Sequence, residues 1–279
     1  MRARGPRRGR LLAAALLCWV VSLAGCTAAG EGLPGKPGDT RTRSVRVQPC
    51  TGTDAPMRHT PSESLDYRAQ LQGPAEPPGC TDGRWRFVLP AVGNAPMKRR
   101  TELWLSEEKG YANGDDAVID MRIRAYLGDA AFDASQWHVV WQLHGPTFGD
   151  WLGPALTLQV NNGQWVLAGG NGHAEHGSGG SNYMWHRPIA RFSNGQTKRV
   201  RVEVHVTHNP DRARVDAWVD DTQVLRDYSP RSRQGLSPGT LYPGQEAVQG
   251  RIGLYRGTLP GGSAPTYEQI VEVWDPATR

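Results

Sequence analysis

Three short segments of the chain place polar side chains at alternate positions, the spacing of residues that share one face of a strand. They are Arg100-Thr101-Glu102-Leu103, Gln142-Leu143-His144 and Arg251-Ile252-Gly253-Leu254-Tyr255. Each segment alone is typical of an ordinary strand with one solvated face. Together they bring arginine, glutamine, histidine and tyrosine to one set of strands, and these side chains can bind anions and transfer protons. The sequence therefore indicates a polar site on a β-sheet.

The elements that must position these segments are strands. Val200, Val202, Val204 and Val206 alternate with polar residues, which is the pattern of a strand with one buried face. About ten strands of this kind are expected, at residues 84–89, 118–125, 137–144, 155–160, 165–168, 200–206, 213–219, 223–225, 251–255 and 268–274. Gly, Pro and Asn-Gly breaks separate them, and the sequence has no convincing amphipathic helix. We expect an all-β fold, an antiparallel β-sandwich of the concanavalin A-like jelly-roll type, whose concave sheet forms a substrate groove.

The composition agrees with a turn-rich β protein. The chain has 279 residues with 10 Trp, 34 Gly and 21 Pro, which does not suit a helical bundle. Residues 1–25 contain five arginines and no acid, so the other 254 residues carry 27 Lys and Arg against 27 Asp and Glu. The formal net charge of that part is zero. A nucleic-acid partner is not expected, because such proteins need a persistent basic surface.

The N-terminal segment has the pattern of an export signal. A basic start precedes an apolar run, Leu11 to Leu23, that is too short to span a membrane. Leu23-Ala24-Gly25-Cys26 resembles the bacterial lipobox, in which the cysteine thiol receives a diacylglyceryl group. We expect a lipoprotein signal peptide at residues 1–25, lipidation of Cys26 and a flexible tether at residues 26–42, with an ordinary secretion signal as the alternative. The protein would then be exported and held on the outer face of a bacterial cell membrane through its lipid anchor only.

The remaining cysteines predict a disulfide. Of the four cysteines, one leaves with the signal peptide and Cys26 carries lipid, so Cys50 and Cys80 remain. Two cysteines in an exported chain most simply pair with each other. Closing a loop of this size stabilises the fold by roughly 3–4 kcal/mol in the chain-entropy account. The bond would hold an N-terminal extension, residues 43–80, to a jelly-roll domain at residues 81–279.

The three polar segments resemble the signatures of jelly-roll polysaccharide lyases. Arg-Thr-Glu-Leu, Gln-Leu-His and Arg-Ile-Gly-Leu-Tyr-Arg are similar to the alginate-lyase motifs R-[ST]-E-L, Q-[IV]-H and Y-F-K-x-G-x-Y, and to the G-[IL]-Y-R strand end of glucuronan and heparin lyases. The motifs occur in the family's order, and the resemblance covers residues 84–275. The chain departs from the pattern at Arg251, where the family usually has lysine, and at Gln249-Gly250, where an aromatic pair is common. The resemblance implies an enzyme, a carbon–oxygen lyase that cleaves a uronic-acid-containing polysaccharide by β-elimination.

The resemblance also implies a role for each motif residue. β-Elimination removes the C5 proton of a uronate and then expels the C4 oxygen, so the adjacent carboxylate must first be neutralised. Gln142 and Arg100 would neutralise it, with Glu102 orienting Arg100. Tyr255 would protonate the leaving oxygen, and either His144 or Tyr255 would remove the C5 proton, depending on the stereochemistry at C5.

Additional residues are expected to line the substrate site, namely Glu102, Arg251, Arg256, His173 and Tyr183. His173 lies in a glycine-rich stretch, residues 169–180, that we expect to form a mobile lid. Its spacing to His176 lacks the helix that would make a metal site convincing, so no metal site is predicted. No cofactor is expected to be required, and a structural calcium ion is left open. The expected partner is an acidic polysaccharide, and the protein is expected to be a monomer.

Two other function classes suit a jelly roll. A non-catalytic, lectin-like carbohydrate-binding lipoprotein would keep the groove and the aromatic residues, but would not need Gln142, His144 and Tyr255 together. A sandwich-type glycoside hydrolase would need paired carboxylates at strand spacing across the scissile bond, and the sequence has no such run. The complete polar set therefore favours the lyase over the binding module.

Overall fold

The computed structural model describes residues 42–46, 50, 68–73, 75–91, 99–104, 110–145, 153–170, 172–173, 181–258 and 265–278. The expected signal peptide, Cys26 and the expected tether as far as residue 41 lie outside these ranges. Residues 34–279 form one compact unit. Among the described residues, no helix has the length and apolar character needed to cross a membrane.

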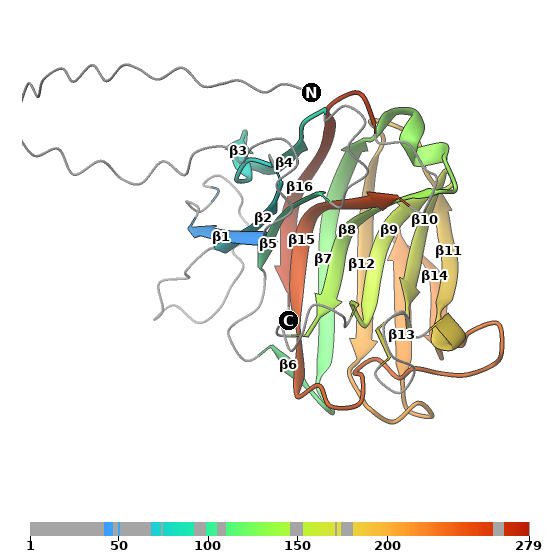
Figure 1. Cartoon of the computed structure of the whole chain (residues 1–279). Coiled ribbons are helices and arrows are strands. Elements are labelled where there is room, and N and C mark those ends of the chain that lie inside the picture. Colours follow the sequence, from blue (N-terminus) through green and yellow to red (C-terminus); the bar gives the residue numbers. More distant parts are fainter. Residues whose placement is uncertain are drawn as a thin grey trace, which may run out of the picture. The chain divides into compact units, whose positions relative to one another are not determined.

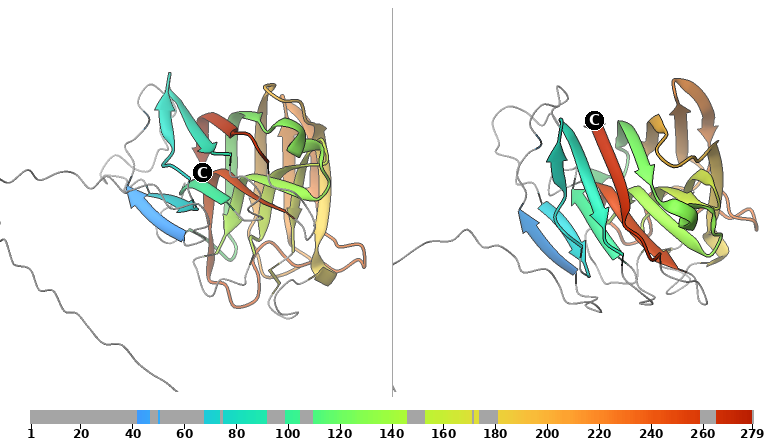
Figure 2. Two further views of the ribbon diagram at one scale, coloured as in Figure 1. Left: turned by 45° about the horizontal axis from the view of Figure 1, so that its top comes forward. Right: turned by 90° about the horizontal axis from the view of Figure 1, so that it is seen from above.

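Two antiparallel sheets make up this unit (Figures 1 and 2). The nine-stranded sheet has, in spatial order, β1 (Thr42–Arg46), β2 (Arg68–Gln72), β5 (Arg99–Trp104), β15 (Ala247–Thr258), β8 (Gln136–His144), β9 (Leu156–Asn161), β10 (Gln164–Gly169) and β11 (Trp185–Arg191), and β6 (Tyr111–Ala112) also pairs with β15. The seven-stranded sheet has β14 (Thr222–Tyr228), β13 (Arg214–Val219), β12 (Thr197–His205), β7 (Asp116–Tyr126), β16 (Gln269–Thr278), β4 (Arg84–Leu89) and β3 (Gly79–Thr81). The helical elements of the described residues are two short 3-10 turns, η1 (Gly128–Phe132) and η3 (Ser181–Tyr183). The predicted all-β sandwich is confirmed.

The core lies between the two sheets and follows from the alternation in the sequence. On β12, Val200, Val202 and Val204 are buried while their neighbours point outward. Leu103 and Trp141 of the nine-stranded sheet belong to the same cluster of buried side chains. Because successive residues of a strand point to opposite faces, the neighbours of these core residues must lie on the outward faces of the sheets.

The strands described within the predicted N-terminal extension, residues 43–80, belong to the two sheets of the sandwich. β1 pairs with β2, and β2 pairs with β5, at one side of the nine-stranded sheet. β3 pairs with β4 at the edge of the other sheet. The expected boundary at residues 80 and 81 is corrected accordingly, because hydrogen-bonded strands on both sides of it belong to the same sheets.

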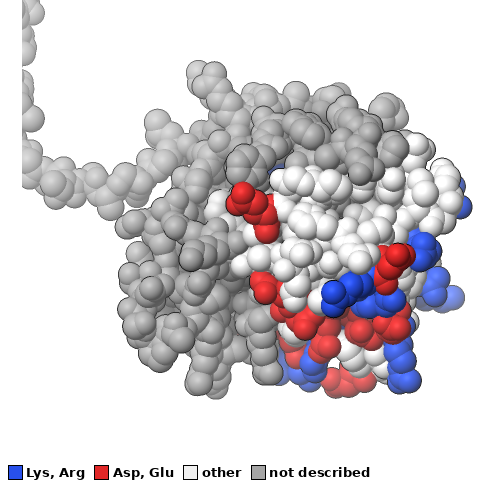
Figure 3. Space-filling view, turned by 90° about the horizontal axis from the view of Figure 1, so that it is seen from below, with Lys and Arg blue, Asp and Glu red and all other residues white. Residues whose placement is uncertain are grey.

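The outward face of the seven-stranded sheet carries matched charges. Ion pairs on this face join Arg199 to Asp120 and Asp221, Arg201 to Glu203, Arg124 to Glu272 and Arg214 to Asp227. In one view of the molecule, basic and acidic side chains lie next to one another on one part of the described surface (Figure 3). Neighbouring strands thus balance their charges on this side of the sandwich.

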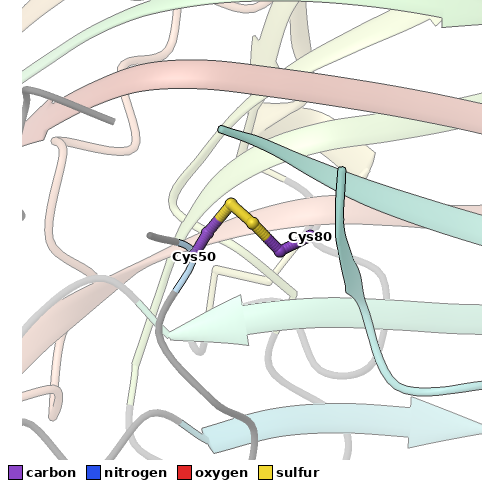
Figure 4. The surroundings of a disulfide bond; sticks show 2 residues. All are labelled: Cys50 and Cys80. Atoms are coloured by element: carbon purple, nitrogen blue, oxygen red, sulfur yellow. A yellow bond between two sulfur atoms is a disulfide. The ribbon is translucent and has the colours of Figure 1, made fainter. Parts of the chain in front are cut away.

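The predicted disulfide is present. Cys50 and Cys80 are bonded, with their Cα atoms 5.1 Å apart and the two residues 30 positions apart in sequence (Figure 4). Cys80 lies on β3, next to the strand that carries Trp85 into the core. The bond therefore ties the segment between β1 and β2 to the edge of the seven-stranded sheet.

Candidate active site

The three predicted polar segments become neighbours because β5, β15 and β8 are adjacent in the nine-stranded sheet. Arg251 on β15 lies opposite Gln142 on β8, and Tyr255 lies opposite Arg100 on β5. Gly253, between them, lies opposite Glu102. These residues alternate with core residues, so they lie on the face that points away from the seven-stranded sheet, called the site face below.

Tyr255 lies on the site face because β15 alternates regularly from Arg251 to Tyr255 against β5, although β15 is bulged relative to β8. The pairing of β15 with β8 shifts between Ile252 and Tyr255, so β15 has one more residue than β8 across this step. Gly253 has a φ of 149°, and a Cβ atom at this position would lie 2.2 Å from the backbone oxygen of Thr101. Only glycine therefore allows β15 to approach β5 this closely.

Arg100, Glu102, Gln142 and Tyr255 form one contiguous set. The Gln142 Nε2 atom donates a hydrogen bond of 2.7 Å to Glu102 Oε1. Arg100 Nε lies 3.1 Å from Glu102 Oε2, an ion pair without the alignment of a hydrogen bond. The guanidinium of Arg100 also lies over the Tyr255 ring, 4.0 Å from its centroid. Glu102 and Gln142 are fully buried, so Glu102 orients both Arg100 and Gln142 from below the site face.

Gln70, on β2, was not predicted as a site residue. Its side-chain oxygen accepts hydrogen bonds from Arg100 Nη1 at 2.5 Å and from Arg251 Nη1 at 2.9 Å. The alternation of buried Ala69 and Leu71 with Gln70 was visible in the sequence. The pattern is short, however, and without the sheet order nothing connects it to residues 30 and 181 positions away.

Two tryptophans also contact the set and were not predicted. The Trp137 ring meets the edge of the Tyr255 ring at a centroid distance of 4.8 Å. The guanidinium of Arg251 lies over the Trp104 ring at 5.1 Å. Stacking on an aromatic ring fixes the orientation of a guanidinium, and its N–H groups, which lie in the guanidinium plane, can still donate hydrogen bonds. The aromatic rings therefore hold Tyr255 and Arg251 in place.

His144 has one ring nitrogen assigned by its surroundings. Its Nδ1 atom lies 2.8 Å from the backbone oxygen of Gly145. Because a carbonyl oxygen can only accept, Nδ1 carries the hydrogen and Nε2 is left with its lone pair. Burial, together with the charges of Arg251 and Arg100, lowers the pKa of His144 to about 3. His144 is therefore neutral at neutral pH and can accept a proton on Nε2.

The charges of the site do not balance. Burial raises the pKa of Glu102, against the opposing effect of Arg100, Arg251 and the Gln142 hydrogen bond. Burial also lowers the pKa of Arg251 to about 10, which leaves it protonated at neutral pH. With Glu102 ionised, the two guanidiniums and one carboxylate carry one net positive charge, and protonation of Glu102 would only increase it. The site is therefore suited to an anion.

The structure does not bring Arg256, His173 and Tyr183 to this set. Arg256 follows Tyr255 directly and so points to the opposite face, where its Nη1 atom donates to Gln269 Oε1 at 2.9 Å between the sheets. The expected contact of Arg256 with substrate is corrected for this reason. His173 is 4% exposed, stacks on Tyr183 with 3.9 Å between the ring centroids, and meets the Tyr242 ring at a centroid distance of 5.9 Å. The rest of the predicted lid, residues 174–180, lies outside the described residues.

No group of three or more His, Cys, Asp or Glu side chains arranged to hold a metal ion occurs among the described residues. Structural calcium stays an open expectation. The chemistry of the site is that of two arginines, an amide, a neutral imidazole and a phenol. Such a set can bind an anionic group and transfer protons beside it.

Comparison with known proteins gives the following matches. The profile of the family described as polysaccharide lyase matches residues 62–274. Among solved structures, an endo-β-1,4-glucuronan lyase from the fungus Trichoderma reesei is similar with a TM-score of 0.54 and 14% identity, over 88% of this chain and 92% of that one. Alginate lyase A1-II', of polysaccharide lyase family 7, gives a TM-score of 0.45 and 15% identity, over 71% and 79%. No curated protein sequence matches the chain.

Proposed function

The chain belongs to the polysaccharide lyase family, and from this premise we propose that it cleaves a uronic-acid polymer by β-elimination at the site around Arg100, Gln142, His144 and Tyr255. One observation carries the proposal. The set of Arg100, Glu102, Gln142 and Arg251 adjoins Tyr255 and has a net positive charge, beside a histidine that is kept neutral. These are the requirements of an elimination next to a carboxylate.

The proposed sequence of steps uses only side chains of this site. The guanidiniums and the Gln142 amide bind the uronate carboxylate and stabilise the charge that develops on it when the C5–H bond breaks. Nε2 of His144 takes the C5 proton, the electron pair forms the C4–C5 double bond, and the C4–O bond breaks. The Tyr255 hydroxyl then gives its proton to the leaving oxygen. Binding of the carboxylate also offsets the arginine charges near His144, which makes the imidazole a stronger base in the complex.

Tyr255 is the alternative base, and the choice depends on which side of the sugar ring carries the C5 hydrogen. Polymannuronate and polyguluronate differ in configuration at C5, so they separate the two possibilities. His144→Ala is expected to stop cleavage of the polymer whose C5 hydrogen faces His144. It is expected to spare more of the activity on the other polymer.

One experiment tests the function directly. The purified domain is incubated with glucuronan, polymannuronate, polyguluronate and a heparin-type polymer, and the ultraviolet absorbance of the unsaturated product ends is followed. Release of unsaturated ends from at least one polymer is expected. Tight binding of a uronate polymer without unsaturated ends would instead identify a carbohydrate-binding module, and the proposal would be abandoned.

We also propose that the protein is exported and anchored through lipid on Cys26, as a monomer. The basic start, the apolar run and the Leu-Ala-Gly-Cys sequence support this proposal. Labelled fatty acid should enter the wild-type chain and not the Cys26→Ala variant. Equal labelling of both chains would contradict the lipid anchor.

A further inference from the structure

The side chain of Gln70 lies between two arginines of the site, Arg100 and Arg251. Its strand, β2, lies beside β5, and Gln70 is directly opposite Glu102, which is itself opposite Gly253 on β15. The side chains of Gln70 and Arg251 meet across β5, the strand between them. A single amide oxygen thereby accepts from Arg100 at 2.5 Å and from Arg251 at 2.9 Å.

The two guanidiniums need such an acceptor because they have the same charge and are largely removed from water. Arg251 is 1% exposed, and the side chain of Arg100 is 12% exposed. Glu102 compensates only one of the two charges. A neutral amide offsets part of the repulsion through its dipole and leaves the excess positive charge in place, whereas a carboxylate at the same position would cancel that charge.

Arg251 also keeps donors for a ligand. Its Nε and Nη2 atoms are buried, and neither has a hydrogen-bond partner among the residues that the structure describes. A buried N–H of a guanidinium that lacks a partner carries a substantial desolvation cost. An anionic oxygen entering the site would remove this cost.

We propose that Gln70 is a positioning residue, which holds Arg100 and Arg251 as a pair that binds the carboxylate of one uronate. This inference rests on the proposed function, and it adds a residue outside the three motifs as well as a reason for its chemistry. The Gln70 side chain must be a neutral amide, because a carboxylate of the same size would lower the affinity of the site for an anion.

The test compares Gln70→Glu with the wild-type protein. The variant keeps the shape and an acceptor oxygen but adds a negative charge between the arginines. KM for the uronate polymer should rise about 10- to 100-fold, the effect of weakening a charge-assisted contact, while kcat changes by a much smaller factor. Gln164→Glu adds the same charge at an exposed position at the start of β10 and should leave both constants unchanged. An unchanged KM in Gln70→Glu would overturn the inference.

Binding measurements separate this inference from the proposed function. Calorimetry with a short uronate oligosaccharide, and with the same oligosaccharide after carboxyl reduction, needs no turnover. Gln70→Glu should weaken binding of the acidic form by a similar factor and leave binding of the reduced form unaltered. Equal losses for both forms would mean a general structural role and would overturn the inference. Absence of unsaturated product from the wild-type protein, with the charge-selective loss still present, would refute only the lyase function.

Discussion

Arginine side chains lie on the outward faces of both sheets, but their surroundings differ. On the seven-stranded sheet, Arg199 pairs with Asp120 and Asp221, and its side chain is 50% exposed. On the nine-stranded sheet, Arg100 and Arg251 share a single carboxylate, Glu102, and Arg251 is 1% exposed. The first arrangement matches each charge in water, while the second concentrates an excess charge away from water.

A cleft alone does not mark the site. A cleft of about 240 Å³ is lined by Arg199, Arg201, Trp218 and Asp221 on the seven-stranded sheet. Residues of the same types, arginine, tryptophan and an acid, also meet on the site face. What distinguishes the two regions is the balance of charge and its burial, because exposed pairs are screened and contribute little.

The largest effect is expected for Tyr255→Phe. The change keeps the ring beneath Arg100 and beside Trp137 but removes the transferable proton, so kcat should fall about 10²- to 10⁴-fold while polymer binding changes little. Turnover of purified variants on the best polymer from the panel measures this. Tyr228→Phe, on the seven-stranded sheet, is the matched control and should keep full turnover. Full elimination rate in Tyr255→Phe would remove Tyr255 from the mechanism.

Most of the sandwich could be predicted because its signals are local. The alternation on β12 defines a buried face without knowledge of its partners, and the motif residues Arg100 and Gln142 lie on the expected strands. The face of Arg256 could also have been predicted, since it is adjacent to Tyr255 in sequence. Gln70 could not be found in this way, because its role depends on a contact across 181 residues that only the sheet order creates.

The bulge in β15 explains a second limit of sequence reasoning. From Gly253 to Tyr255, β15 pairs residue by residue with β5. In the same stretch its pairing with β8 shifts by one residue. A bulge of this kind depends on how closely two strands approach, and Gly253 is its only sign in the sequence. The contact between Tyr255 and Trp137 of β8 follows from this shift in pairing and was therefore missed.

Removing one arginine charge should affect activity on the site face but not on the outward face of the seven-stranded sheet. Arg251→Gln removes the excess positive charge of the site, and kcat/KM should fall about 10- to 100-fold. Arg251→Lys restores a charge without the Gln70 contact and should lose less, in agreement with the lysine that related motifs have at this position. Arg199→Gln, on the matched surface, should leave kcat/KM unchanged. Equal losses for Arg251→Gln and Arg199→Gln would contradict the comparison.

The free energy of unfolding should depend on pH through His138, a histidine buried between the sheets. His138 accepts a hydrogen bond from Gln269 at 2.9 Å, and burial, with the nearby charge of Arg256, lowers its pKa to about 3. As the pH falls below about 6.5, a histidine of the unfolded chain takes up a proton that the folded state cannot bind. The free energy of unfolding should therefore decrease by about 1.4 kcal/mol per pH unit for this residue, until the pH approaches its folded pKa.

Urea unfolding at several pH values between 7 and 4 checks this expectation. His138→Gln keeps an acceptor for Gln269 but cannot be protonated, so the dependence of the unfolding free energy on pH should become shallower by about 1.4 kcal/mol per pH unit. An identical slope in the two proteins would show that His138 is not held neutral in the folded state.

The smallest effect concerns the exposed ion pairs of the seven-stranded sheet. Arg199 Nη2 lies 2.8 Å from Asp120 Oδ2, a separation shorter than that of Arg100 from Glu102, yet the Arg199 side chain is half exposed to solvent. If geometry alone set the strength of a pair, Arg199 and Asp120 would be coupled more strongly. Because water and salt screen exposed charges, a double-mutant cycle of Arg199→Gln and Asp120→Asn should give a coupling energy of only about 0.2–1 kcal/mol, decreasing as salt is added. A coupling of several kcal/mol that persists at high salt would mean that burial is not what separates the two sets of arginines.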